Sequence, residues 1–173
     1  MKSDYRSIAT LHDLFDFDIR RFIYAEIVLK KHLSSWIEKA NSLTLKTSLQ
    51  VYLDYLKQNV QQFETLLKSE EILSLSLSNK IMQAFIEETE EKMDQCADPE
   101  VNDACLLASV QSINHYKISA YGTAAAFARA LGLEKPGTVF HHAEANEKQI
   151  DEHLSHLAKS EINIRAQAPI LLS

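Results

Sequence analysis

Glycine and proline are scarce in this sequence, with three of each among 173 residues. An all-β sandwich or barrel needs many turn residues between short strands, so this scarcity argues against one. Hydrophobic residues make up 46% of the chain and charged residues 24%, which is typical of a globular protein with a core. The composition therefore favours an all-α fold made of long helices with few connections.

Cysteine is equally rare, and its two positions are Cys96 and Cys105. With only two cysteines, neither a disulfide nor a zinc site is expected. Cys105 falls within an apolar helical pattern, and we expect it to be a small core residue.

Long apolar runs and basic runs are also missing. No apolar stretch reaches the roughly 18 residues of a membrane-spanning helix, so no membrane partner is expected. The net charge is -6 and no stripe of arginine and lysine stands out, which argues against nucleic acid as a partner. The first residues, MKSDYRSIAT, lack the apolar centre of a signal peptide, which predicts a cytoplasmic protein.

What the sequence does contain is helical periodicity, because apolar residues recur three or four positions apart over most of its length. This spacing predicts four long helices and one shorter helix. The long helices are expected at residues 10–40, 42–68, 99–131 and 136–159, and the shorter one at residues 79–95.

Polar and helix-breaking residues mark the ends of these helices. Ser42 or Thr44 can cap the second long helix. Asp98 and Pro99 form a strong start for the third, with an N-cap acid followed by proline at the first helical position. Gly132 stands where a helix C-terminus takes a glycine.

The connections between the helices predict the topology. Short links join the first long helix to the second and the third to the fourth, whereas a long connection with a small-residue linker at Ser74–Ser78 carries the short helix. This pattern predicts a ferritin-like four-helix bundle with one crossover. We expect one domain over residues 1–160 and a loose tail over residues 161–173, where Pro169 prevents further helix.

Polar residues interrupt the apolar stripes on all four long helices. Because a buried charge is costly unless it is paired or binds a metal, several such residues at one depth suggest a site. The candidates are Glu26 on the first helix, Gln58 and Gln62 on the second, Lys117 on the third, and Glu147 and Asp151 on the fourth.

The sequence resembles the YciE/YciF family of ferritin-like proteins. The resemblance covers about residues 8–160. It is carried by TLHDLF (10–15), FIYAEIVLKKHL (22–33), ADPEVNDACL (97–106), HYKISAYGTAAAFARALG (115–132) and NEKQIDEHL (146–154). It implies a ferritin-like bundle, a cytoplasmic location, dimers and a link to stress responses, with no settled enzymatic reaction.

The resemblance also implies a two-metal site, but most of its ligand positions are changed here. Glu26 and Glu147 match acids of the family. On the second helix, the family has Glu followed four residues later by His or Gln, and this chain has Gln58 and Gln62 at these positions, so the acid is missing. In the family's Glu-His-Tyr-Glu pattern this chain has Asn114 and Lys117 in place of the two acids. Glutamine is a poor ligand for a hard cation, and a lysine ammonium has no lone pair and repels one.

We therefore predict a non-enzymatic bundle with a degenerate, metal-free site that acts through its surface, as a homodimer or by binding a partner. One alternative is a single metal ion on Glu26, Glu147 and Asp151. The rival hypothesis is a ferritin-like metalloprotein, with iron or manganese in a dinuclear or mononuclear site, that binds or oxidises iron or consumes peroxide.

Three structural expectations follow from the residues. First, residues 79–95 should form a separate helix lying across the bundle. Second, the first long helix carries more apolar residues than one inward stripe needs, which predicts a homodimer through the first or second helix. The surplus residues are Phe15, Ile19, Ile23, Ile27 and Trp36.

Third, the Lys117 amine should replace the metal. It is expected to bind two or three of the carboxylates of Glu26, Glu147 and Asp151, while the amides of Gln58 and Gln62 donate to spare oxygens. One amine does not neutralise three acids, so one acid should lie nearer to solvent or take up a proton.

Overall fold

The computed structural model describes residues 7–69 and 78–167. Its helices are α1 (Leu11–Lys39), α2 (Leu43–Ser69), α3 (Lys80–Gln95), α4 (Pro99–Ala130), α5 (Glu134–Leu157), a π-helical turn η1 (Ala158–Ile162) and α6 (Asn163–Ala166). The predicted all-α fold with four long helices and a shorter fifth helix is confirmed. Most of the linker at residues 74–78 and the end of the tail, including Pro169, lie outside the described residues.

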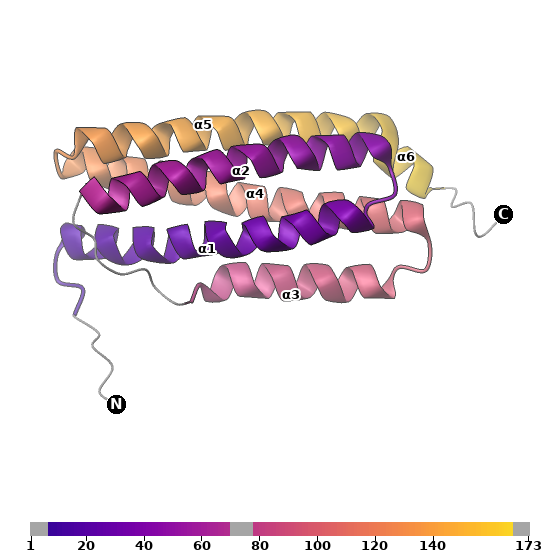
Figure 1. The fold of residues 1–173 in the computed structure, drawn as a ribbon, viewed down its shortest axis with the longest axis horizontal. Helices are drawn as coiled ribbons and strands as arrows, with labels where there is room; N and C mark the ends of the chain where they lie inside the picture. The colour runs from indigo at the N-terminus through magenta and orange to yellow at the C-terminus, as the bar shows by residue number, and fades with distance from the viewer. Residues whose placement is uncertain (1–6, 70–77, 168–173) are drawn as a thin grey trace.

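The four long helices form a bundle in which every neighbouring pair is antiparallel (Figure 1). Helix α1 packs beside α2 and α4, and α5 packs beside α4 and α2. Helices α2 and α4 run in the same direction, so the chain must cross the length of the bundle between them, and α3 makes this return (Figure 1). Helix α3 is separate, as expected, but it runs along the bundle beside α1 and α4 rather than across it.

Side-chain caps fix where the helices begin. Thr10 starts α1 with a capping box, in which its hydroxyl accepts from the Asp13 N–H and the Asp13 carboxylate accepts from the Thr10 N–H. The Asn79 side chain caps α3, and Asp98 caps α4 as predicted. Gly132 adopts φ 73° after α4, the left-handed conformation expected of a C-terminal glycine.

The turn between α1 and α2 is attached to α4 by Asp103. This carboxylate is 2% exposed and accepts hydrogen bonds from the backbone N–H groups of Asn41 and Ser42, both at 2.7 Å. The Ser42 hydroxyl in turn accepts from the Leu45 N–H at the first turn of α2, as one of the two predicted caps. Asp103 thus fixes the α1–α2 hairpin relative to α4, two elements that are far apart in the sequence.

The C-terminal end differs from the expected tail. The chain remains helical through η1 and α6 to Ala166, and Ile162 is only 1% exposed in the core cluster. The prediction of a loose tail from Glu161 is therefore wrong for residues 161–166. Burial of the Ile162 side chain stabilises this segment by more than the free energy that forming a short helix costs. Helix α5 also begins slightly earlier than expected, at Glu134 rather than Pro136.

The core consists of two apolar clusters that lie one after the other along the bundle. One is built around Trp36, Leu33 and Leu106, and the other around the aromatic rings of Phe15, Phe63 and Phe140. Within the described residues, no helix has the length and hydropathy needed to span a membrane. The boundary between the two clusters is where the polar residues are found.

Candidate functional site

A buried ion cluster lies at the boundary between the two apolar clusters. Its centre is Lys117, whose Nζ lies 3.1 Å from Glu26 Oε1 and 2.6 Å from Glu147 Oε1. All three side chains are 0% exposed. The three residues come from α4, α1 and α5, so this contact joins three of the four long helices.

Neighbouring side chains complete the cluster. The Tyr52 hydroxyl of α2 accepts from Lys117 Nζ at 3.1 Å and donates to Glu147 Oε2 at 3.0 Å. The Asn114 amide donates to the same oxygen at 2.7 Å and to the backbone carbonyl of Glu147 at 3.1 Å. The ammonium also lies 4.8 Å from the centre of the Tyr52 ring and 5.8 Å from that of Tyr121, within reach of cation–π attraction.

The surroundings shift the pKa values of the central groups in one direction. Burial lowers the pKa of Lys117, because it disfavours the charged ammonium. The negative charges of Glu147 and Glu26 have the larger effect, so the Lys117 pKa is raised above its ordinary value. Burial raises the pKa of Glu26 from its ordinary value near 4.5 to about 7, although the Lys117 charge lowers it in part. Lys117 is therefore a permanent cation, while Glu26 is the acid that takes up a proton near neutral pH.

Three further residues, Gln58, Gln62 and Asp151, were expected in this cluster, but they lie elsewhere in the structure. Asp151 lies toward the surface with its side chain 20% exposed, and its Oδ1 is 3.2 Å from His115 Nε2. Gln58 and Gln62 are exposed and line a surface groove between α2 and α5. Their expected role as amide donors is therefore wrong, because Gln58 lies two residues, or about 200°, around the helix from the buried Leu56.

Tyr52 and Tyr121 are the members of the cluster that the sequence did not indicate, and Asn114 was expected only as a changed metal-ligand position. Tyr121 lies beside Glu26, and its pKa is raised first by burial and then by the charge of Glu26. Asn114 and Tyr121 stand three residues before and four residues after Lys117, so they share its face of α4. The spacing of three or four residues from Lys117 is therefore the sequence signal that could have identified Asn114 and Tyr121 as members of the cluster.

The residues of the cluster do not fit a resident metal ion. An ammonium occupies the position between the two buried carboxylates, where a cation would have to bind, and it offers no lone pair. In the part of the chain that the structure describes, no group of three or more histidine, cysteine, aspartate or glutamate side chains is arranged to hold a metal. The arrangement can neutralise charge and join helices, but it is not a ligand set.

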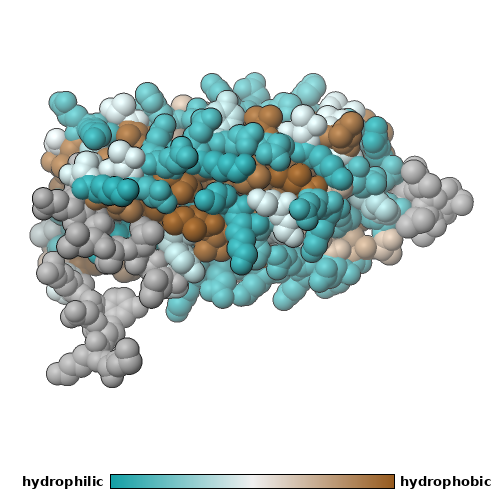
Figure 2. All heavy atoms as spheres, in the orientation of Figure 1, coloured by the Kyte–Doolittle hydropathy of each residue, from teal (hydrophilic) through white to brown (hydrophobic). Residues whose placement is uncertain are grey.

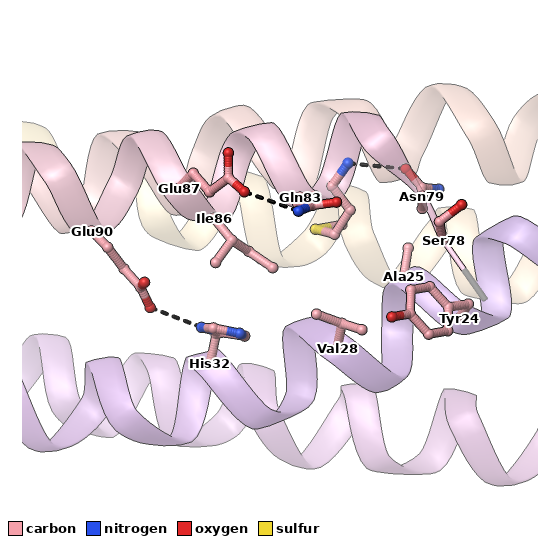
Figure 3. Close-up of a pocket in the computed structure, with 11 residues that line it drawn as sticks. Tyr24, Ala25, Val28, His32, Ser78, Asn79, Gln83, Ile86, Glu87 and Glu90 are labelled. Carbon is pink, nitrogen blue, oxygen red and sulfur yellow. Dashed lines mark hydrogen bonds and ion pairs between the residues drawn. The ribbon is translucent and has the colours of Figure 1, made fainter.

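A groove lies on the surface between α1 and α3 (Figure 3). Its volume is about 320 Å³, and Glu90 Oε1 lies 2.8 Å from His32 Nδ1 at one end. Ser78 lies at the opposite end from His32 (Figure 3), so the serine, histidine and acid of this groove do not form a nucleophile–base pair. Its apolar wall is formed by Ala25, Val28, Met82 and Ile86.

Comparisons with known proteins identify relatives that span nearly the whole chain. Protein YciF of Escherichia coli K12 is 26% identical over 162 residues, which is 93% of this chain and 98% of YciF. The crystal structure of that stress protein matches with a TM-score of 0.83 at 26% identity, covering 90% of this chain and 99% of that one. YcfI from Rhodopseudomonas palustris matches with a TM-score of 0.84 at 27% identity, covering 88% and 98%.

These matches agree with the resemblance to the YciE/YciF family drawn from the sequence. The family described as a domain of unknown function (DUF892) matches residues 10–167, from the capping residue of α1 to the end of α6. This chain therefore belongs to the DUF892 family.

Proposed function

We propose that this protein is a non-enzymatic, metal-free ferritin-like bundle that acts through its surface in a stress response. The observation that carries the proposal is the Lys117 ammonium bound between the buried carboxylates of Glu26 and Glu147. In a ferritin-like bundle, inward carboxylates of this kind hold metal ions. Here the lysine supplies the positive charge, so the bundle is stable without a metal.

The burial of the cluster supports a structural role rather than a catalytic one. Glu26, Lys117 and Glu147 are each 0% exposed, so no substrate can reach them without opening the bundle. Polar groups at the rim of the α1–α3 groove bind one another, as Gln83 Nε2 donates to Glu87 Oε1 at 3.0 Å. A link to stress comes from the relative described as a stress protein, YciF. We place the protein in the cytoplasm.

Metal analysis tests this proposal directly. Protein purified without a histidine tag, after cells are supplied with iron and manganese, is expected to hold well below one metal ion per chain. The matched control is Lys117→Glu, which removes the ammonium and supplies a third buried carboxylate, so this variant should gain Mn²⁺ or Fe²⁺. Stoichiometric metal in the unaltered protein would overturn the proposal and favour the metalloprotein hypothesis.

The homodimer remains a prediction, but the apolar residues of α1 that suggested it do not lie on the surface. Phe15, Ile19, Ile23 and Trp36 are buried inside the protomer, at 2% exposure or less, because α4 and α3 also cover α1. A broken band of hydrophobic surface is nevertheless visible along the junction of α1 and α2 in Figure 2. On α2, Leu43 and Val51 are 77% and 51% exposed.

Light scattering tests this dimer. At tens of micromolar, the mass is expected to be twice the 19.7 kDa of one chain. Leu43→Glu together with Val51→Glu should shift the mass toward one chain, because two charges would then be buried in the interface. Ile164→Glu, at another exposed apolar side chain far along the sequence, is the control and should leave the mass unchanged. A mass of 19.7 kDa for the unaltered protein would refute the homodimer.

A further inference from the structure

The two cysteines of the chain lie on either side of the turn that joins α3 to α4. Cys96 is the C-terminal capping residue of α3, and Cys105 lies in the second turn of α4. Both are free thiols and both are partly exposed. Neither belongs to the buried ion cluster or to the α1–α3 groove, so their proximity needs its own explanation.

The backbone of this turn brings the two thiols together. Only Ala97 and Asp98 separate Cys96 from the first residue of α4, and the chain reverses there, so the start of α4 runs back along the end of α3 (Figure 1). The Cys96 thiol donates to the Lys92 carbonyl at 3.2 Å, which directs it back along α3.

Cys105 packs against the core cluster. Phe85 of α3 and Tyr116 of α4 pack together with ring centroids 5.7 Å apart, and Cys96 and Cys105 each lie eleven residues, or about three helical turns, nearer to the turn. The two cysteines therefore lie on the facing sides of α3 and α4.

We propose that Cys96 and Cys105 are a redox modification site that forms an intramolecular disulfide when the protein meets a hydroperoxide. In the first step, the Cys96 thiolate attacks one peroxide oxygen, the O–O bond breaks, and a sulfenic acid and one molecule of water or alcohol form. In the second step, the Cys105 sulfur attacks the Cys96 sulfur. The S–S bond forms, the S–O bond breaks, and the hydroxide leaves as water with the Cys105 proton.

The environment assigns the order of the two thiols. Burial and the adjacent Cys96 thiol raise the pKa of Cys105, which leaves less of it as thiolate. Cys105 also packs against the core cluster, whereas the hydrogen bond of the Cys96 thiol is exposed, so Cys96 is the thiol that attacks the peroxide first and Cys105 resolves it. The product fastens the C-terminus of α3 to α4, adding a covalent bond at the end of the crossover helix.

Peroxide treatment of the full chain tests the site. Brief exposure to hydrogen peroxide is expected to reduce the intact mass by two hydrogen atoms, and a non-reducing digest should contain one peptide pair joining Cys96 to Cys105. Dithiothreitol should reverse both changes. The disulfide closes a short loop and restrains the unfolded chain, so the oxidised protein should also melt a few degrees higher.

Two matched variants test which of the two thiols reacts with peroxide first. In Cys105→Ser, Cys96 should accumulate as a sulfenic acid that dimedone labels, because no resolving thiol remains. In Cys96→Ser, labelling at Cys105 should be at least several-fold weaker. Equal labelling of the two variants would overturn the order of attack. Two thiols that stay free after peroxide treatment, that oxidise independently to sulfinic acids, or that join separate chains would overturn the site itself.

Discussion

Replacement of Lys117 by methionine is expected to lower the free energy of unfolding by about 3–5 kcal/mol, the usual cost of breaking a buried ion pair by removing one partner. Methionine fills a similar volume, so the change leaves little cavity. It does remove the cation from between Glu26 and Glu147, which are 0% exposed and would then repel each other. Urea denaturation followed by circular dichroism measures the loss.

The surface offers a matched control for this substitution. Lys148 forms an ion pair with Glu144 at 2.6 Å, but its side chain is 60% exposed. Lys148→Met should therefore cost less than about 1 kcal/mol. The loss from Lys117→Met should also be largely recovered when Glu26→Gln and Glu147→Gln are added, because no buried charge then remains. If the triple variant is as unstable as Lys117→Met alone, lost packing rather than stranded charge explains the effect.

Local signals in the sequence were sufficient to predict most of the fold. The short helix α3 and the start of α4 follow from Asn79 and from the pair Asp98-Pro99, which act through bonds within a few residues of themselves. The Gly132 cap is local in the same way. The helical end at residues 161–166 was missed because its stability depends on Ile162 reaching a core made by distant helices.

The candidate site was predictable only in part, because some of its contacts depend on helices that are distant in the sequence. Glu26, Lys117 and Glu147 interrupt apolar stripes, and the position on the helix determines that they point inward. Gln58 was expected to point inward because it stands next to the apolar stripe of α2, although the adjacent Asn59, 3% exposed, is the amide on the buried face. Whether an inward acid is fully enclosed, as Glu147 is, or reaches solvent, as Asp151 does, depends on neighbouring helices.

Tyr52 and Tyr121 show why the partners of the ion cluster were not foreseen. Both occur on apolar stripes, where a tyrosine ring fits as well as a phenylalanine ring, and both are 1% exposed or less. Only the assembled bundle shows that the Tyr52 hydroxyl meets Lys117 and Glu147. The sequence also predicted that one of the three acids would lie nearer to solvent or take up a proton. This agrees with the structure, because Asp151 lies nearer to solvent and the pKa of Glu26 is raised.

The stability of the protein is expected to fall by about 3 kcal/mol between about pH 4.5 and pH 7 through Glu26 alone. Its pKa is about 7 in the folded protein and near 4.5 when unfolded, because burial disfavours the carboxylate. In this window the folded state retains a proton that the unfolded chain has lost. Unfolding therefore becomes easier as the pH rises, and the contribution is constant again above pH 7.

The substitution Glu26→Gln isolates this effect, because glutamine resembles the protonated acid and does not titrate. The unfolding free energy of the unaltered protein minus that of Glu26→Gln should fall by about 3 kcal/mol from pH 4.5 to pH 8, measured by urea denaturation. Glu87→Gln, at an exposed acid, is the control, and its difference should change by less than about 0.5 kcal/mol. A difference for Glu26→Gln that stays constant or rises with pH would mean that Lys117 holds Glu26 ionised throughout. The buried cluster would then carry two full negative charges and one positive charge, and we would expect such a cluster to attract a further cation.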